Sequence, residues 1–350
     1  MIDLIDKLCR EKTLTAEEFV FLIENRNDKY AEILFERARK ARKENYGTDI
    51  YIRGLIEFSN YCKNDCYYCG IRKSNPNALR YRLSEEEILS CCDKAYGLGF
   101  RTFVLQGGED GHFTPEKMEA IIKKIKSAYP DSALTLSFGE HPRDVYKSWY
   151  DAGADRYLLR HETADEEHYK LLHPESLSLA NRMRCLWDLK EIGYQVGCGF
   201  MVDSPYQTAE RIAKDLLFIA NFKPDMVGIG PFIPACDTPF SDKLSGSVSL
   251  TLYLLAIIRI ILPDVLLPAT TALATRDSLG LEKGILAGAN VIMPNISPKE
   301  AKEKYALYEG KRYTDGAAED ALKNLSERME KIGYKIVTSR GDKKGRIYNV

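Results

Sequence analysis

Short apolar runs alternate with longer, more polar stretches through the middle of this chain. The runs number eight: Arg53–Ser59, Arg101–Gln106, Ala133–Phe138, Asp155–Arg160, Gln195–Val202, Met226–Phe232, Leu266–Thr271 and Ala289–Pro294. Near-continuous apolar runs are typical of parallel strands that are buried on both faces. Eight strand-and-helix units over about 250 residues match the length of a closed barrel. The sequence therefore predicts an α/β fold, a full (β/α)8 TIM-type barrel over residues 49–296, with a partial barrel of six units as the alternative.

Helix-start signals stand between the apolar runs. Ser84 and Thr163 each stand three residues before a glutamate, which is the pattern of a capping box. Thr114 directly precedes a proline, and proline is favoured at the first position of a helix. These signals predict that helices connect the strands.

Two flanking regions lie outside the predicted barrel. Residues 1–48 are expected to form an N-terminal helical extension, with a further capping box that begins at Thr15. Residues 297–350 are expected to form a C-terminal helical extension packed on the barrel, with two helices, a capping box that begins at Ser297 and a polar end over 341–350. Neither region carries a chemical motif.

The bulk properties exclude several classes of partner. The formal net charge is −1, so acidic and basic residues nearly cancel and nothing indicates the basic face that a nucleic acid would need. The first residues, Met1–Lys7, lack the unbroken apolar core of a secretion signal. The longest apolar stretch, Leu252–Leu262, is interrupted by Arg259 and is too short to cross a bilayer. We expect a cytoplasmic protein without nucleic-acid or membrane partners.

Three cysteines stand close together after the first apolar run. Cys62, Cys66 and Cys69 form the pattern C-x-x-x-C-x-x-C. This spacing lets one loop hold three irons of a 4Fe–4S cluster and leaves the fourth iron open to a ligand. A structural zinc site needs four ligands, and the nearest downstream histidine is His112. Zinc and a fortuitous group of cysteines remain alternatives.

The remaining cysteines do not indicate a disulfide framework. The chain has nine cysteines, an odd number, and no secretion signal. We expect these six to be buried apolar fillers rather than ligands: Cys9, Cys91, Cys92, Cys185, Cys198 and Cys236.

With Tyr68 before the third cysteine, the loop resembles the C-x-x-x-C-x-aromatic-C signature of radical S-adenosylmethionine (SAM) enzymes. The resemblance implies a 4Fe–4S cluster whose open iron is chelated by SAM. Gly107, Gly108 and Glu109, at the end of the second run, resemble the G-G-E motif that holds the SAM amino group in this family. A simple turn is the alternative for paired glycines.

The end of the fourth run brings together polar residues. Glu162 is a candidate for the ribose hydroxyls or the ammonium of SAM, and Arg182 is a candidate for its carboxylate. A surface salt bridge is the alternative for Arg182. His161 is expected to be a hydrogen-bonded structural residue, because no second histidine stands at ligand spacing.

Small or polar residues occupy alternate positions inside several predicted strands. They are Thr135 and Ser137, Gly197 and Gly199, and Gly228 and Gly230, with Thr270, Thr271, Arg53 and Arg156 on other strands. If these residues face inward, the barrel encloses a chamber suited to a compact polar or anionic substrate. The alternative is that the glycines admit closely packed helices on the outside.

Longer runs narrow the resemblance to the FeFe-hydrogenase maturase family HydE, a relative of biotin synthase and methylornithine synthase. The similar runs are Ile56–Asn60, Arg156–Thr163, Met226–Pro234, Pro268–Thr271 and Asn290–Asn295. The resemblance implies a substrate that is a mononuclear iron complex carrying cysteine, CO and cyanide, supplied by a HydG-like maturase. It implies a substrate chamber lined by Gln106, Thr135, Arg156, Thr270 and Thr271. It implies SAM contacts by Tyr68, Ser137, Glu162, Arg182 and Met201.

Two features depart from that family's pattern. No cysteine follows Cys236, so the second iron–sulfur site of some HydE proteins is not expected and one cluster is predicted. Where relatives show G-x-P-G-Q, this chain has Asp203, Ser204, Pro205, Tyr206 and Gln207. A paralogue of that family that acts on a different substrate would change this kind of position first.

The sequence leads to three alternative hypotheses for the function. The first is reductive SAM cleavage in hydrogenase cofactor assembly, with an electron donor such as ferredoxin or flavodoxin. The second keeps the chemistry but acts on a small amino-acid-derived substrate, as methylornithine synthase does. The third is a non-catalytic iron–sulfur carrier or scaffold.

Overall fold

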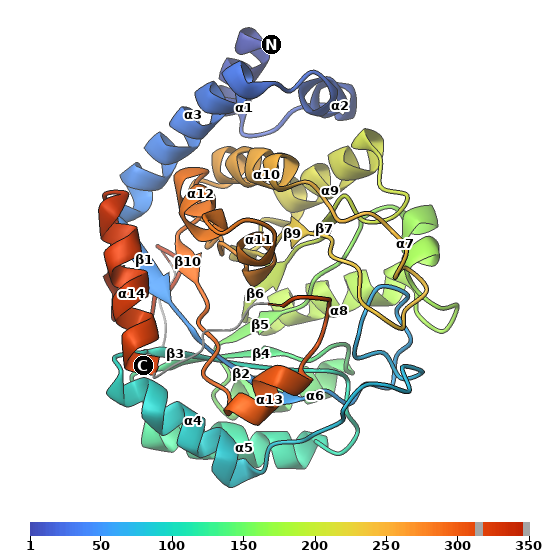
Figure 1. Ribbon diagram of the computed structural model, residues 1–350, viewed down its shortest axis with the longest axis vertical. Helices are drawn as coiled ribbons and strands as arrows, with labels where there is room; N and C mark the ends of the chain where they lie inside the picture. The colour runs from blue at the N-terminus through green and yellow to red at the C-terminus, as the bar shows by residue number, and fades with distance from the viewer. Residues whose placement is uncertain (312–317, 346–350) are drawn as a thin grey trace.

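A parallel sheet of six strands forms the centre of the computed structural model, which describes residues 1–311 and 318–345 (Figure 1). In spatial order the strands are β2 (Gly54–Ser59), β3 (Thr102–Gly107), β4 (Ala133–Ser137), β5 (Arg156–Leu158), β6 (Gln195–Cys198) and β8 (Met226–Val227). Every neighbouring pair in this sheet is parallel. The first six predicted runs thus coincide with these strands to within one residue or contain them, in chain order around the sheet.

Isolated bridges carry the sheet from β8 back to β2 and close the barrel. The bridges pair Met226 with Leu266, Pro268 with Val291, and Leu55 with Asn295. β10 (Val291–Ile292) also pairs with β1 (Asp49–Ile52), and β1 runs into β2 through Arg53. The fold is therefore the full barrel rather than the partial one.

Three predicted strands differ from the structure in detail. The run Gln195–Val202 splits into β6 and β7 (Met201–Val202), because Gly199 has a φ of 150°, which a regular strand does not use. The run Met226–Phe232 splits into β8 and β9 (Gly230–Pro231), and β9 pairs with β7. The run Leu266–Thr271 forms bridges only, and a helix begins at its last residue.

Helices cover the outside of the barrel (Figure 1). They are α4 (Glu85–Gly97), α5 (Pro115–Ala128), α6 (Arg143–Asp151), α7 (Glu166–Leu172), α8 (Leu179–Ile192), α9 (Ala209–Phe222), α10 (Val248–Ile261), α11 (Thr271–Arg276) and α12 (Gly280–Leu286). Most bury one apolar face, but α10 is buried at nearly every position. A helix that is apolar all round must be covered on both sides.

The N-terminal helices provide that cover. They are α1 (Ile2–Glu11), α2 (Ala16–Glu24) and α3 (Asp28–Tyr46). α3 and α1 pack on α10, and α2 packs on α9. Figure 1 shows all three at the side of the barrel that α10 covers. The helical extension is thus a second layer over one side of the barrel.

The capping predictions are confirmed at three positions and wrong at two. Thr15 and Ser84 form complete capping boxes, and Thr114 accepts a hydrogen bond from the Lys117 amide. Thr163 does not cap α7, because Asp165 stands at the N-cap and accepts from the His168 amide. Ser297 does not cap α13, because its Oγ accepts a hydrogen bond from the Glu57 amide in β2 at 2.8 Å.

The C-terminal region adds α13 (Lys299–Lys304), α14 (Ala318–Lys331) and β11 (Lys335–Val337). The strand β11 was not predicted, and it pairs in parallel with β1. Residues 312–317 and 346–350 of the predicted C-terminal extension, including part of its polar end, lie outside the described residues.

A short segment after β11 closes the end of the barrel where the strands begin. We call Arg340–Lys343 the plug. The Asp342 carboxylate accepts from Arg156 at 2.6 Å and from Gln195 at 2.9 Å. Lys343 Nζ lies 3.3 Å from the carboxylate of Asp264. The plug therefore ties together residues at the amino ends of β5, β6 and the seventh unit.

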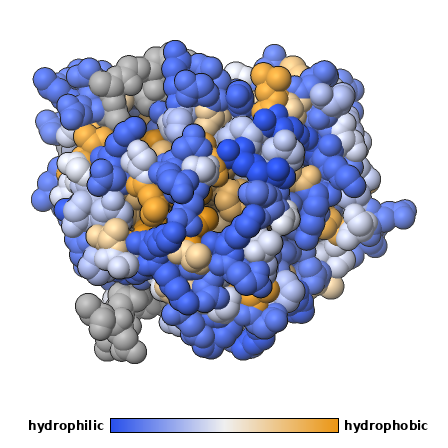
Figure 2. All heavy atoms as spheres, turned by 90° about the horizontal axis from the view of Figure 1, so that it is seen from below, coloured by the Kyte–Doolittle hydropathy of each residue, from blue (hydrophilic) through white to orange (hydrophobic). Residues whose placement is uncertain are grey.

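The described part of the chain contains no helix that is both long and apolar enough to span a bilayer. On the face seen in Figure 2, hydrophilic residues predominate and apolar ones gather in hollows between them. The large apolar side chains lie mainly in the core between the strands and the helix layer.

Candidate active site

Cys62, Cys66 and Cys69 lie in the loop that follows β2, at the end of the barrel where the strands finish. All three are free thiols and half-buried. Backbone hydrogen bonds fix the loop to three distant segments: Lys63 N to Glu109 O at 2.9 Å, Tyr67 N to Leu172 O at 3.0 Å and Gly70 N to Leu307 O at 2.9 Å. The loop is thus held in place by the protein itself.

The three thiols lie near one another, as the ligands of one iron–sulfur cluster must. Among the described residues, no three Cys, His, Asp or Glu side chains are gathered as the ligands of one ion are. Burial raises the pKa of Cys66 well above its usual value, and the neighbouring thiols Cys69 and Cys62 raise it further. The three thiols therefore lie close enough for their charges to interact. Burial raises the pKa of Cys69 to about 12, so cluster binding would have to displace its proton.

The glycine pair at the end of β3 allows a close approach of two backbone segments. A Cβ atom at Gly108 would lie 2.2 Å from the Tyr61 carbonyl oxygen and 2.7 Å from Cys62 Cβ. A Cβ atom at Gly107 would lie 2.8 Å from the ring of Phe58. The glycine at 108 therefore lets β3 approach the cysteine loop itself.

Glu109 is fixed beside that loop and is only 7% exposed. Its Oε1 accepts a hydrogen bond from the Glu140 amide at 3.0 Å, and its Oε2 lies 3.0 Å from Lys63 Nζ. Gly139, with a φ of 92°, leaves the room that this carboxylate occupies. A carboxylate held in this way suits an ammonium group, which is the role expected of it.

Glu162 has strained backbone geometry. Its φ is 64°, a value that a residue with a side chain rarely adopts. Its side chain is nearly buried, and Oε2 lies 3.3 Å from Arg160 Nη2. Such strain tends to occur at functional positions. This geometry supports Glu162 as a ligand-binding residue.

Arg182 lies near Glu162 but has protein partners. Its Nε donates to the Glu140 carboxylate, and its Nη1 donates to the Arg160 carbonyl at 2.6 Å. The pair with Glu140 is buried, so it is not the surface salt bridge considered as the alternative. Contact of Arg182 with the SAM carboxylate remains a prediction.

Tyr68 is held by a buried histidine. Its hydroxyl lies 3.2 Å from His173 Nε2, and His173 Nδ1 lies 3.0 Å from the Tyr169 carbonyl. Burial, with the nearby Arg182, lowers the pKa of His173 to about 3. The neutral ring therefore carries its proton on Nδ1 and accepts from Tyr68. Met201 packs in the same apolar cluster as Tyr68.

Several polar groups inside the barrel lack hydrogen-bond partners among the described residues. Thr135 Oγ1, Thr270 Oγ1 and two nitrogens of Arg53 are buried in this state. Arg53 Nη1 reaches Met226 Sδ at 2.9 Å, on the far side of the barrel. Burial, and then the nearby Arg156, lower the pKa of Arg53 well below its usual value. Buried polar groups normally have partners, so these groups indicate an interior built for a ligand.

Gln106 and Ser137 face each other in the β3–β4 register, at the carboxyl ends of these strands. At Gly228 a Cβ atom would meet nothing closer than 4.0 Å, whereas at Gly199 it would lie 2.0 Å from the Gly228 carbonyl. Only at Gly230 does a helix residue, Ala272, come close. Outer helix packing therefore does not explain these glycines as a group.

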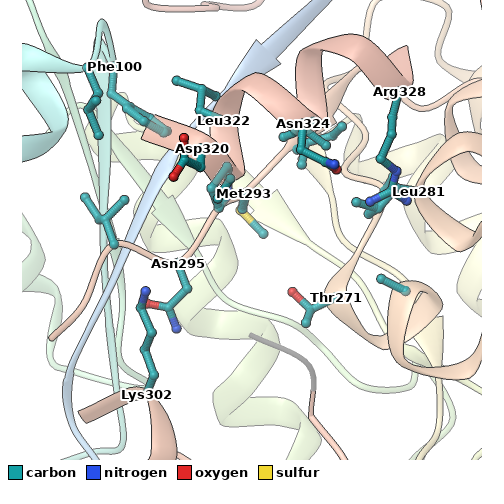
Figure 3. A pocket seen from close by; sticks show the side chains of 18 of the residues that line it. Phe100, Thr271, Leu281, Met293, Asn295, Lys302, Asp320, Leu322, Asn324 and Arg328 are labelled. Carbon is teal, nitrogen blue, oxygen red and sulfur yellow. The ribbon is translucent and has the colours of Figure 1, made fainter. Parts of the chain in front are cut away.

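Two predicted chamber residues lie elsewhere. The Arg156 guanidinium donates to Thr102 Oγ1 and to the plug, at the opposite end of the barrel from the cysteines. The structure therefore does not place Arg156 with the residues at the strand ends. Thr271 lines a separate cavity of about 530 Å³ together with Met293 and with residues of α14 (Figure 3). Its neighbour Thr270, by contrast, lies close to Gly230.

His161 is buried, and its Nδ1 accepts a hydrogen bond from the Gly199 amide at 3.2 Å. Its Nε2 lies 3.3 Å from the Asp215 carboxylate. These contacts confirm the structural role that was expected. Of the six other cysteines, four are buried as predicted, but Cys9 is half-buried and Cys236 is exposed.

The loop that departs from the family pattern is tightly held. The Asp203 carboxylate accepts from the Ser247 amide at 2.8 Å, and Gln207 Nε2 donates to the Met201 carbonyl at 2.9 Å. Asp203 and Tyr206 both have positive φ, at 54° and 67°. The backbone thus keeps the conformation that glycine favours, at the cost of some strain.

Sequence reasoning missed a buried polar group at the same end of the barrel. Glu57 in β2 is fully buried, and its carboxylate accepts from Lys311 and from Asn295 Nδ2 at 2.7 Å. Tyr305 OH lies 3.4 Å from Gln106 Nε2. The signal that could have revealed Glu57 is a charged residue inside an otherwise apolar run.

Comparisons with known proteins agree with this geometry. The model of the Radical SAM superfamily matches residues 56–219. The chain is 47% identical over 286 residues to the FeFe hydrogenase maturase subunit HydE of Thermotoga maritima, covering 81% of each chain. It is 29% identical over 331 residues to the 3-methylornithine synthase of Methanosarcina acetivorans, covering 94% of this chain and 92% of that one.

Solved structures show the same fold. The crystal structure of methylornithine synthase (PylB) matches with a TM-score of 0.83 and 27% identity, over 95% of this chain and 97% of that chain. The structure of HydG, a maturase of the FeFe hydrogenase, matches with a TM-score of 0.79 and 22% identity, over 96% and 76%. The chain belongs to the radical SAM superfamily and, within it, to the family of the FeFe hydrogenase maturase subunit HydE.

Proposed function

We propose that this protein cleaves SAM reductively and directs the resulting radical at a small substrate inside the barrel, as a step in assembly of the FeFe-hydrogenase cofactor. When bound, a 4Fe–4S cluster would supply the electron that breaks the sulfonium C–S bond of SAM, giving methionine and the 5′-deoxyadenosyl radical. The observation that carries the proposal is the fixed three-thiol loop next to Glu109 and Glu162. The 47% identity to HydE supports the place in hydrogenase maturation.

The chain's own residues would have these roles. Cys62, Cys66 and Cys69 would hold the cluster. Residues near the loop would bind SAM: Tyr68, Gly107, Gly108, Glu109, Ser137, Glu162, Arg182 and Met201. Unpartnered groups in the interior, chiefly Thr135 and Thr270 with Gln106 nearby, would hold the substrate.

The substrate we propose is the cysteine-bound iron dicarbonyl cyanide complex, supplied by a HydG-like enzyme. A ferredoxin or flavodoxin would supply electrons, and the protein would work in the cytoplasm.

We propose a single cluster. A second iron–sulfur site would need further ligands in the C-terminal region, and no cysteine follows Cys236. Iron and sulfide analysis of anaerobically reconstituted protein should give about four of each per chain, as one 4Fe–4S cluster requires. Eight of each would contradict this.

The central test is anaerobic reconstitution followed by reduction with dithionite in the presence of SAM. We expect 5′-deoxyadenosine to form, and we expect SAM to change the EPR spectrum of the reduced cluster. A fully loaded cluster with no 5′-deoxyadenosine and an unchanged spectrum would instead indicate an iron–sulfur carrier.

A second candidate is a rearrangement of a small amino acid, as in methylornithine synthase. Two observations favour it: the likeness to that enzyme covers nearly the whole chain, and Asp203 and Tyr206 change the loop after β7. Deletion of the gene in a hydrogenase-producing host separates the two. Loss of hydrogenase activity supports the maturase, and unchanged activity supports the rearrangement.

A further inference from the structure

A segment after α13 crosses the end of the barrel that carries the cysteines. We call Tyr305–Lys311 the strap. The Leu307 carbonyl accepts from the Gly70 amide at 2.9 Å, beside the cysteine loop, and the Glu309 amide donates to the Pro234 carbonyl at 3.0 Å, after β9. Because these anchors follow different strands, the strap spans the carboxyl end of the barrel. Figure 1 shows the chain leaving α13 and crossing the view over the sheet.

Two side chains of the strap reach residues of the barrel wall, one buried and one half-buried. Lys311 Nζ donates to Glu57 Oε1 in β2, and Tyr305 OH accepts from Gln106 Nε2 in β3 at 3.4 Å. Glu57 and Gln106 are direct neighbours in the β2–β3 register. The strap therefore holds two adjacent side chains of one wall.

The contact with Glu57 is an ion pair in an apolar setting. Glu57 is fully buried, and the Lys311 side chain is 10% exposed. Burial raises the pKa of Glu57 and lowers the pKa of Lys311. Each charge would be unfavourable alone, so each depends on the other. Asn295 Nδ2 completes the site by donating to Glu57 Oε2 at 2.7 Å.

Barrel closure does not require this pair, because the strands are joined by their own backbone hydrogen bonds. An apolar pair would pack at least as well in such a place. The pair does, however, fix side chains on the wall that contains Gln106. We propose that Lys311 and Tyr305 are positioning residues for the substrate: through Glu57 and Gln106, the strap sets the shape and charge of the wall that the substrate contacts. This inference rests on the proposed function, since it concerns that substrate.

The first test measures whether the pair holds the strap. Lys311→Met leaves Glu57 buried without its partner, so we expect amide hydrogen exchange over residues 305–311 to rise by about a hundredfold in the holoenzyme. The double variant Glu57→Gln with Lys311→Met removes both charges and should return exchange close to the original rate. Lys299→Met, an exposed lysine in α13, is the control. Unchanged exchange in Lys311→Met overturns the inference.

The second test separates a positioning role from a merely structural one. With the cysteine-bound iron dicarbonyl cyanide complex as the probe, Lys311→Met and Tyr305→Phe should raise KM by about tenfold while kcat changes little. Lys311→Arg keeps the charge and should restore KM. Variants that lower kcat and leave KM unchanged would contradict the positioning role.

The two proposals can fail separately. If the unaltered, reconstituted protein forms no 5′-deoxyadenosine with dithionite and SAM in the absence of the iron complex, the proposed function fails. If it cleaves SAM but does not respond to the iron complex, its substrate is wrong, and the exchange experiment alone then decides the inference. If the protein cleaves SAM and turns over the iron complex, but Lys311→Met and Tyr305→Phe behave like the control Lys299→Met, only the inference about the strap fails.

Discussion

Thr270 and Thr271 are neighbours in the sequence but meet different surroundings. Thr270 Oγ1 is buried near Gly230 and lacks a hydrogen-bond partner among the described residues. Thr271 lines the cavity shown in Figure 3, beside Met293. Only Thr270 therefore has a hydroxyl group that a ligand in the interior would be needed to satisfy.

We predict that Thr270→Val has opposite effects on stability and on binding. Replacing an unsatisfied buried hydroxyl with a methyl group should raise the free energy of unfolding by about 1 kcal/mol. It should weaken substrate binding about tenfold while the Kd for SAM is kept. Thermal unfolding and binding titrations would check both. Equal loss of SAM and substrate binding would show that Thr270 lies at the SAM end instead.

Gly108 offers a test of the cysteine loop. In Gly108→Ala the new Cβ would meet backbone atoms of the loop, which cannot move aside without shifting Cys62. We expect the free energy of unfolding to fall by about 1–3 kcal/mol and the iron content to fall severalfold. Iron analysis and urea unfolding would measure these changes. Gly111→Ala is the matched control, because a Cβ there meets nothing within 4 Å.

At the scale of elements, the caps show where sequence patterns succeed. Thr15 and Ser84 cap their helices because the box needs only local backbone and a glutamate three residues on. Thr163 fits the same pattern, yet Asp165 takes the position, and its carboxylate also pairs with Lys214 at 2.6 Å. The capping-box pattern cannot tell whether Thr163 or Asp165 caps the helix, because both residue types are favoured at an N-cap.

We predict that Asp165→Ala lowers the free energy of unfolding by about 1–2 kcal/mol, because the His168 amide loses its acceptor. The change should also loosen the cysteine loop, since the end of α7 accepts the hydrogen bond from Tyr67. Urea unfolding followed by circular dichroism would measure it. Asp165→Asn keeps the cap and should lose much less, and an equal loss would point to the ion pairs with Lys214 and Arg211 as the cause.

The strands were predictable from the sequence where both faces of the strand are buried. They were not predictable where one or both faces are exposed. β2 to β5 are buried on both faces over most of their length and carry several apolar residues each, so their runs are clear in the sequence. β1 and β11 are short, and β11 is mostly exposed or half-buried, so no run marks them. The cysteine loop was predictable because its ligands are local. Glu57 and Lys311 are 254 residues apart, and no local pattern links them.

At the scale of the whole molecule, the plug joins the start of the strands to the end of the chain. Arg340 also lies 2.9 Å from the Asp155 carboxylate. The plug therefore forms ion pairs with a positive side chain, Arg340, as well as with a negative one, Asp342. This arrangement explains why Arg156, which the sequence suggested for the substrate, is engaged at the opposite end of the barrel.

The plug predicts a specific dependence of stability on pH. Burial alone would raise the pKa of Asp342, but Arg156, with Gln195 and Arg340, lowers it from 3.8 to about 2. A depressed pKa contributes stability that is fully present above the ordinary value and is lost as the pH falls toward the folded one. We expect Asp342→Asn to lower the free energy of unfolding by about 2 kcal/mol at pH 7.

That difference between Asp342→Asn and the unaltered protein should shrink as the pH falls from about 4 to 2. Urea unfolding of the cluster-free protein at several pH values would measure it. A difference that stays constant over this range would show that Arg156 and Asp342 interact little.

The position of the plug in the chain also bears on biosynthesis. Residues 340–343 emerge from the ribosome after every barrel strand, yet they hold the amino ends of several of those strands. A nascent chain can pair its strands and form its cysteine loop before the plug closes the amino end of the barrel. Iron–sulfur delivery before residues 340–343 are made would therefore meet a barrel whose amino end is not yet closed.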